Sequence, residues 1–192
     1  MSNYCFKTEP YDHQNTAFDE SRDLQNFALF MDMGTGKTKV VLDTIGAAFE
    51  AGEINLALII APKGVVPNWL SEIDTHLPDR IVRETVLWKP SLTKTKRAEL
   101  NSLYEGDSKL RFLLMNVEAF STKKGVDVAK LFVEQFDTFM VVDESTGEKN
   151  EGSLCRGPWC AVQEDFDGES GYQVPSRSLQ PTGIPGPRDT GI

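Results

Sequence analysis

Residues 31–40 read "MDMGTGKTKV", and this stretch decides the fold expected for the whole chain. An apolar run at 26–31 precedes it, and a segment with helical spacing of its apolar residues follows at 37–52. Glycines between a strand and a helix let backbone N–H groups turn inward around an anion. The N-terminus of the helix adds partial positive charge at the same point. The order strand, glycine turn, Lys-Thr and helix therefore predicts a phosphate-binding loop.

Each residue type in this loop has a place in the predicted chemistry. Lys37 can reach the β- and γ-phosphates of a nucleotide, and the hydroxyl of Thr38 can ligate Mg²⁺. The strict motif has a glycine where this chain has Met31, so only its second half, GTGKT, is matched. A strand–turn–helix joint with an incidental lysine is the alternative interpretation. The residues whose backbone we expect to surround the phosphates are Met33, Gly34, Thr35 and Gly36.

Composition narrows the class of protein. The chain has 192 residues, and its net charge of −9 argues against a protein that coats nucleic acid by charge alone. A local basic groove remains compatible with that charge. No apolar run approaches the ~20 residues of a membrane helix, and the first residues do not form a signal peptide. We therefore expect no membrane contact and a location in the cytoplasm.

Apolar runs alternate with helical patterns beyond the loop. Strands that are apolar throughout and alternate with helices indicate a mainly parallel sheet covered on both faces, which is an α/β fold. In the predicted helix at 65–77, Trp69 and Leu70 are assigned to the hydrophobic core. The further strands are expected at 54–62, 84–89, 110–116 and 138–145, and the further helices at 92–106 and 126–136.

A second chemical signal is "FMVVDES" at 139–145, where an apolar strand ends in two acids. At the carboxyl end of a parallel strand, such acids face the crevice in which ligands bind. Asp143 is expected to hold Mg²⁺, directly or through water, and Glu144 to polarise the attacking water. An acidic strand end that caps the next helix is the alternative. Three β-like runs separate this segment from Thr38, and that spacing supports the phosphate-binding interpretation.

Five ordered segments carry a family resemblance: "FKTEPYDHQ", "MDMGTGKT", "LIIAPKGVVPNWLSEI", "LLMNVEAFST" and "VVDEST". Together they resemble the N-terminal motor lobe of superfamily-two helicases, and most closely the Swi/Snf-like ATPases and their phage and bacterial relatives. In these proteins the first position of the glycine loop is occupied by a residue other than glycine, and Met31 occupies it in this chain. Glu148 departs from the pattern, because relatives carry an apolar residue there.

The resemblance implies a three-layer RecA-like lobe and a set of roles. ATP and Mg²⁺ would be the cofactors, with Lys37 and Glu144 as catalytic residues and Gln14 as the reader of the adenine edge. The partner would be nucleic acid, expected to be DNA. The residues implied to touch its backbone are Pro62, Lys63 and Asn116.

The chain divides unevenly at about residue 150. Residues 1–150 form the expected ATP-binding domain, which the resemblance implies to be incomplete. Residues 151–192 contain seven Gly and five Pro without a sustained period, which predicts an irregular or disordered tail. A tail translated out of frame is a further hypothesis for this segment.

Two function classes remain open from the sequence. The first is the ATP-binding lobe of a DNA helicase or translocase. In this class a second RecA-like lobe, which supplies an arginine, is required for activity and cannot be recognised here. The alternative is a nucleotide-binding module without motor activity, inert or completed by another chain. A P-loop ATPase outside the helicases is a weaker third possibility.

Overall fold

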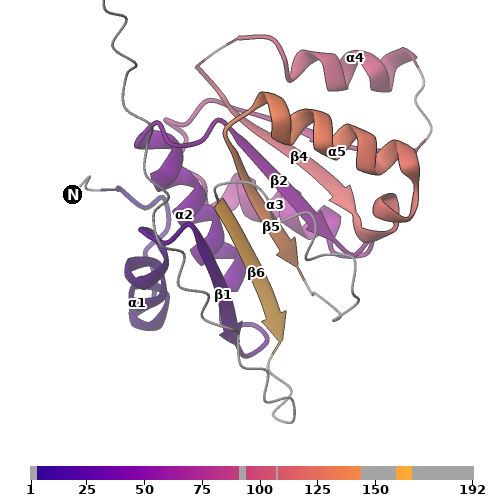
Figure 1. Ribbon diagram of the computed structural model, residues 1–192. Helices are drawn as coiled ribbons and strands as arrows, with labels where there is room; N and C mark the ends of the chain where they lie inside the picture. The colour runs from indigo at the N-terminus through magenta and orange to yellow at the C-terminus, as the bar shows by residue number, and fades with distance from the viewer. Residues whose placement is uncertain (1–3, 91–93, 107, 144–158, 166–192) are drawn as a thin grey trace, which may run out of the picture.

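The computed structural model describes residues 4–90, 94–106, 108–143 and 159–165. Its centre is a six-stranded sheet in which every pair of neighbouring strands is parallel, in the order β1-β6-β5-β2-β4-β3 (Figure 1). Parallel pairing brings all six carboxyl ends to one edge of the sheet. The strands are β1 (Asn26–Met31), β2 (Leu56–Ala61), β3 (Arg83–Leu87), β4 (Leu110–Asn116), β5 (Thr138–Asp143) and β6 (Trp159–Asp165).

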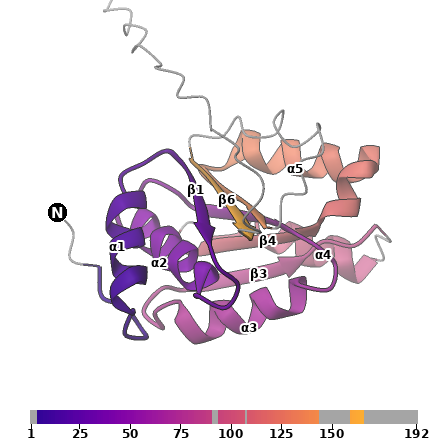
Figure 2. The same cartoon turned by 90° about the horizontal axis from the view of Figure 1, so that it is seen from below.

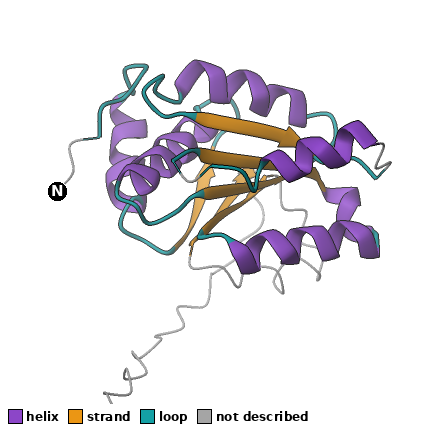
Figure 3. Ribbon diagram, turned by 90° about the horizontal axis from the view of Figure 1, so that it is seen from above, coloured by secondary structure: helices purple, strands orange, loops and turns teal. Residues whose placement is uncertain are grey.

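Helices cover both faces of this sheet, which makes three layers (Figures 2 and 3). One layer contains α2 (Lys37–Glu50) and α3 (Val66–His76), with α1 (Asp12–Ser21) packed against α2. The opposite layer contains α4 (Lys94–Ser102) and α5 (Lys123–Gln135). A 3₁₀ turn, η1 (Val117–Ser121), leads from β4 towards α5.

Strand β2 separates two hydrophobic cores, since neighbouring side chains of a strand point to opposite faces. All six of its residues are buried. Those facing α2 and α3 are Ala57, Ile59 and Ala61. Those facing α4 and α5 are Leu56, Leu58 and Ile60. A strand buried on both faces reads as a continuous apolar run, which is why the sequence identified β2, β4 and β5 so clearly.

The expected α/β architecture with a mainly parallel sheet is confirmed, and two details differ. The tail predicted to be irregular after residue 150 contains a strand, because Trp159–Asp165 form β6 between β1 and β5. Helix α5 begins at Lys123, earlier than the expected residue 126, because Thr122 caps it by accepting a hydrogen bond from the Gly125 N–H at 3.2 Å.

Other predicted features lie outside the described residues. These are the end of the expected strand at 144–145 and the remainder of the predicted tail. Among the helices that are described, none is long and apolar enough to cross a membrane.

Candidate nucleotide-binding site

The loop between β1 and α2 has the backbone geometry of an anion cradle. Gly34 and Gly36 have φ of +76° and +84°, a left-handed conformation that favours glycine. A Cβ atom on Gly36 would lie 2.2 Å from Nε2 of Gln14, so this position excludes a side chain for a second reason. Gly36 is also the N-cap of α2, which places the loop at the positive end of that helix.

Lys37 lies folded against its own loop. Its Nζ donates to the carbonyl oxygen of Met31 at 2.9 Å and to that of Asp32 at 3.3 Å. The Thr35 hydroxyl also donates to the Asp32 carbonyl, at 2.7 Å. The ammonium group is thus held at the end of β1, beside the loop whose N–H groups would receive phosphates.

Gln14 braces this loop from α1. It is buried, its Nε2 donates to the Thr35 carbonyl oxygen at 3.0 Å, and its Oε1 accepts from the Tyr11 N–H at 3.0 Å. Both partners have fixed roles, so they determine which end of the amide is oxygen. Each end keeps capacity for one more hydrogen bond. The predicted reading of adenine by Gln14 stays a prediction, and the contact with Thr35 is a feature that the sequence did not reveal.

Asp143 stands at the carboxyl end of β5, on the same edge as the loop. Strand β6 lies between β1 and β5, so at about 4.8 Å per strand the loop and Asp143 are roughly 10 Å apart along the edge. Asp143 is buried, and its Oδ2 accepts a hydrogen bond of 2.7 Å from the indole Nε1 of Trp69. Glu144, the predicted catalytic acid, lies outside the described residues.

The donor set at this edge fits Mg²⁺. The Thr38 hydroxyl and the Asp143 carboxylate are oxygen donors, which Mg²⁺ prefers. Within the described residues there is no cluster of three or more His, Cys, Asp or Glu side chains that could hold a metal. Mg²⁺ is usually held by one or two protein oxygens together with substrate phosphates and water.

A buried ion pair stiffens α2 directly behind the loop. Lys39 Nζ lies 2.6 Å from Asp43 Oδ2, and both side chains are almost fully buried. The Tyr4 hydroxyl also donates to Asp43, at 3.5 Å. Burial raises the pKa of Asp43 to about 6, against the opposing effect of the hydrogen bond and positive charge of Lys39. The first turns of α2 are therefore sensitive to proton concentration in mildly acidic solution.

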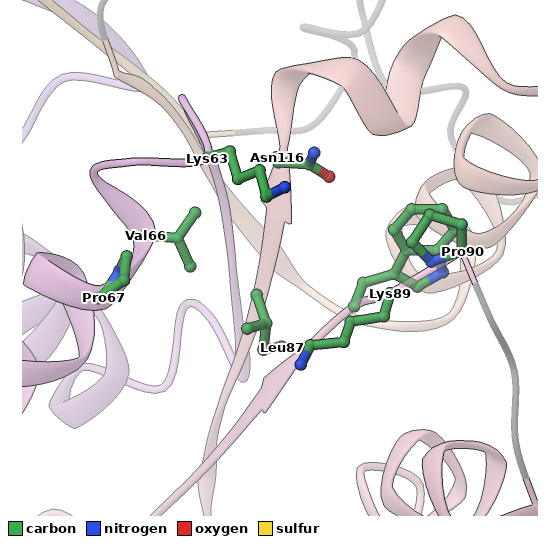
Figure 4. Close-up of a pocket in the computed structure, with 8 residues that line it drawn as sticks. Lys63, Val66, Pro67, Leu87, Lys89, Pro90 and Asn116 are labelled. Carbon is green, nitrogen blue, oxygen red and sulfur yellow. The ribbon is translucent and has the colours of Figure 1, made fainter.

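A cavity of about 610 Å³ opens farther along the same sheet edge, where β2, β4 and β3 end (Figure 4). Two of the residues predicted to contact nucleic acid, Lys63 and Asn116, line it. The third, Pro62, is not among the lining residues, and its carbonyl oxygen accepts hydrogen bonds from Val65 N at 2.9 Å and Val66 N at 3.3 Å. The remaining lining residues are Val66, Pro67, Leu87, Trp88, Lys89 and Pro90.

Sequence reasoning missed two features of this edge. The end of β3, with Leu87 to Pro90, was not assigned to any site, although it forms one wall of the cavity. Trp69 and Leu70 were assigned only to the core. Leu70 is exposed, so its assignment was wrong. Trp69 is fully buried, but its N–H is also bonded to Asp143. The available signal was chemical, because a buried tryptophan N–H usually finds an acceptor.

This chain is similar in sequence to known proteins. The family model described as type III restriction enzyme, res subunit, matches residues 7–145. Among curated proteins, the probable ATP-dependent DNA helicase CHR23 of Arabidopsis thaliana is 28% identical over 169 residues, which are 83% of this chain and 13% of that protein. The chain thus spans only a small part of this relative's length.

Solved structures share the fold. The SWI2/SNF2 ATPase core of Sulfolobus solfataricus in complex with dsDNA matches with a TM-score of 0.62 and 16% identity, over 86% of this chain and 34% of that one. The UvsW helicase from bacteriophage T4 matches with a TM-score of 0.56 and 15% identity, over 82% and 52% of the two chains. These matches confirm the RecA-like lobe predicted from the sequence.

Proposed function

Because the chain belongs to the family of the type III restriction enzyme res subunit and forms the N-terminal ATPase lobe of a superfamily-two helicase of Swi/Snf-like type, we propose that it binds ATP with Mg²⁺ and that the full-length protein uses hydrolysis to move on DNA. One observation carries the proposal. The phosphate loop, Asp143 and the cavity with Lys63 all lie at the carboxyl edge of one parallel sheet. Open α/β sheets bind their ligands at this edge.

The nucleotide would be held by the backbone and by charge. The N–H groups of residues 34–36 and the N-terminus of α2 would receive the phosphates. Lys37 would exchange its bonds to the carbonyls of Met31 and Asp32 for stronger, charge-assisted bonds to phosphate oxygens. Gln14 would use its remaining hydrogen-bonding capacity on the base.

Thr38 and Asp143 would hold Mg²⁺, which when bound neutralises charge on the β- and γ-phosphates. Glu144 would orient the water that attacks the γ-phosphate. Asp143 is already buried and hydrogen-bonded, so its carboxylate is positioned before any ligand arrives.

DNA would lie across the cavity end of the same edge. Lys63 is exposed there, and Asn116 is half-buried with its Nδ2 bonded to Glu118 Oε2 at 2.7 Å. A lysine and a side-chain amide suit backbone phosphates, which position a protein on DNA without reading its sequence. The Sulfolobus ATPase core, which shares this fold and was solved in complex with dsDNA, supports DNA as the partner.

The phosphate site is tested by Lys37→Ala. We expect this variant of the 192-residue chain to lose ATP affinity by about 100-fold or more, because charge-assisted bonds contribute about 1.5–3 kcal/mol each. Isothermal titration calorimetry with ATP and Mg²⁺ measures the change. Lys94→Ala, on α4, is the matched control and should bind as the parent chain does. Equal affinities for Lys37→Ala and the parent would disprove the site.

The DNA contact is tested separately by Lys63→Ala. This variant should keep the parent's affinity for ATP and lose affinity for duplex DNA, with a shallower dependence on salt because one phosphate contact is gone. A chain that binds ATP but no DNA at low salt would favour the second function class, a nucleotide-binding module without motor activity.

A further inference from the structure

The hydrogen bond between Trp69 and Asp143 joins two parts of the molecule that are 74 residues apart in the chain. Trp69 lies on α3 and is fully buried, with its Nε1 2.7 Å from Asp143 Oδ2. This is a short distance for a nitrogen donor, as expected for a bond to a charged acceptor. The indole ring is fixed by the core around it, so it presents its N–H in one direction only.

A fixed donor restricts how the Asp143 carboxylate can rotate at the end of β5. Groups that ligate metals are commonly held by a second hydrogen bond of this kind, and loss of that partner typically lowers metal affinity or activity 10–100-fold.

The same helix reaches the cavity. Val66 and Pro67, in the first turn of α3, line the cavity together with Lys63, which shortly precedes the helix. Trp69 follows within one turn. Val66, Pro67 and Trp69 therefore lie on one stretch of helix, which forms the physical connection between the cavity and the Asp143 carboxylate.

We propose that Trp69 is a positioning residue: its indole N–H orients Asp143 for Mg²⁺, and through α3 it links occupancy of the cavity to that orientation. This inference rests on the proposed function, which supplies the nucleotide, the metal and the DNA. Trp69 itself touches neither substrate nor metal. Its effect is therefore expected in the magnesium dependence of binding rather than in binding itself.

The first test compares Trp69→Phe with the parent chain in two buffers. ATP affinity is measured by calorimetry with Mg²⁺ and again with EDTA. We expect Trp69→Phe to reduce the gain in affinity that Mg²⁺ provides by about tenfold, while affinity in EDTA stays within about twofold. A variant whose packing is weakened without a specific effect on Asp143 should lose affinity for ATP equally in both buffers. An unchanged magnesium gain, or an equal loss in both buffers, would overturn the proposal.

Ile73→Val is the matched control for these titrations. Ile73 is buried on the same helix, in the same hydrophobic core as Trp69, and does not line the cavity. Its substitution loosens the packing of α3 without removing a bond to Asp143. Its magnesium gain should equal that of the parent chain.

A second measurement does not depend on the stability of Trp69→Phe. In the ¹⁵N-labelled chain, the indole N–H resonance of Trp69 is assigned by comparison with Trp88→Phe and Trp159→Phe. Asp143→Asn should shift this resonance and leave that of Trp88 in place. A short DNA duplex should also shift it, and Lys63→Ala should reduce that shift. A Trp69 resonance that responds to neither Asp143→Asn nor DNA would contradict the proposal.

These measurements distinguish a failure of the proposed function from a failure of the inference about Trp69. If the parent chain binds no ATP, the proposed function fails, although the resonance still reports whether Trp69 is bonded to Asp143. If the parent chain binds ATP with Mg²⁺ and Trp69→Phe keeps the full magnesium gain, the inference about Trp69 fails alone.

Discussion

At the scale of single residues, Gly36 is constrained twice, by its own backbone and by its neighbour Gln14. Its φ of +84° disfavours a side chain, and a Cβ atom would meet Gln14 Nε2 at 2.2 Å. Gly34 shares the first constraint, with φ of +76°, but a Cβ atom there would meet nothing within 4 Å. The two glycines therefore form a natural pair for separating backbone strain from steric contact.

We predict that Gly34→Ala costs about 1–2 kcal/mol of unfolding free energy, the usual cost of a left-handed alanine. Gly36→Ala should cost about 1 kcal/mol more, because Gln14 must move and lose its bond to Thr35. Urea unfolding of both variants measures the difference. Adding Gln14→Ala to each should remove most of that difference. Equal destabilisation by the two glycine variants would show that Gln14 can move aside at no cost in unfolding free energy.

Asp43 provides a prediction for pH. Its pKa is raised from 3.8 to about 6, so between these values the folded state binds more protons than the unfolded state. Stability therefore falls as pH rises through this window, by an amount on the order of 3 kcal/mol for a shift of this size. Other carboxylates act in the opposite direction, including Glu84, whose lowered pKa favours the folded state as pH rises.

The contribution of Asp43 is isolated by comparison with Asp43→Asn. Asp43→Asn replaces the titrating carboxyl by a neutral amide of similar size, so the variant lacks the contribution of Asp43 to the pH dependence. The unfolding free energy of the parent minus that of the variant should therefore be highest near pH 4 and should fall by pH 7. Thermal unfolding at several pH values gives this difference. A difference that grows with pH would mean that Lys39 depresses the pKa of Asp43 instead.

Whether the role of a residue can be predicted from the sequence depends on whether the groups it acts with are near it in the chain. The glycines and Lys37 act through backbone geometry and charge that follow from adjacent positions, so a short motif suffices to find them. Trp69 was predicted as a core residue and is one, but its N–H partner comes from a strand late in the chain. No local pattern can identify such a bond.

At the scale of elements, α4 is held to the sheet by a buried arginine. Arg111, on β4, donates through Nη1 to the Lys109 carbonyl at 3.0 Å and through its other nitrogens to the carbonyls of Leu103 and Gly106, just beyond the end of α4. Its guanidinium also lies over the Phe136 ring, 4.9 Å from the centroid. Arg111 therefore satisfies three carbonyls of the segment that joins α4 to β4.

We predict that Arg111→Leu costs about 2–4 kcal/mol, because buried carbonyls lose a charged donor. Arg111→Lys should also destabilise the chain, since an ammonium group cannot reproduce the planar fork. Chemical denaturation gives both values. Arg83→Leu is the control: its partner Asp74 is exposed, so we expect a change below about 1 kcal/mol. A similar cost for Arg83 and Arg111 would contradict this account of α4.

The strand that the sequence missed differs from those that it predicted. β2, β4 and β5 are uninterrupted apolar runs and were recognised from composition alone. β6 has the sequence WCAVQED, with a short apolar stretch that ends in polar residues and glycine and proline in the segment before it. It forms a strand because β1 and β5 offer hydrogen-bonding edges on both sides. Tertiary context of this kind overrides local propensity.

At the scale of the whole molecule, arginine placement predicts slow turnover. Of the arginines in the described part of the chain, four have ion-pair or hydrogen-bond partners outside the phosphate loop, and the remaining one, Arg97, lies on α4. An arginine that meets the charge on the transferring phosphoryl group contributes roughly 10³–10⁵ in rate. We therefore expect the purified 192-residue chain to hydrolyse ATP well below about 1 s⁻¹, the lower end of typical enzymes.

A coupled ATPase assay with and without duplex DNA checks this expectation, and Lys37→Ala gives the background rate. DNA-stimulated turnover of about 1 s⁻¹ or faster would show that an arginine of this chain, or a second copy of it, completes the site. DNA should also alter the affinity for ATP if both ligands use this sheet edge. Such a change would favour the helicase or translocase lobe over the nucleotide-binding module without motor activity.

The late position of β6 has a consequence for how the protein emerges from the ribosome. β1 and β5 each need β6 to complete their pairing, yet roughly 130 residues are synthesised between the end of β1 and the start of β6. At about 5–20 residues per second, the nascent chain spends roughly 6–25 s with the apolar strand NFALFM waiting for its partner. An open strand edge is a site of misassociation, so chaperone demand should fall on this interval of translation.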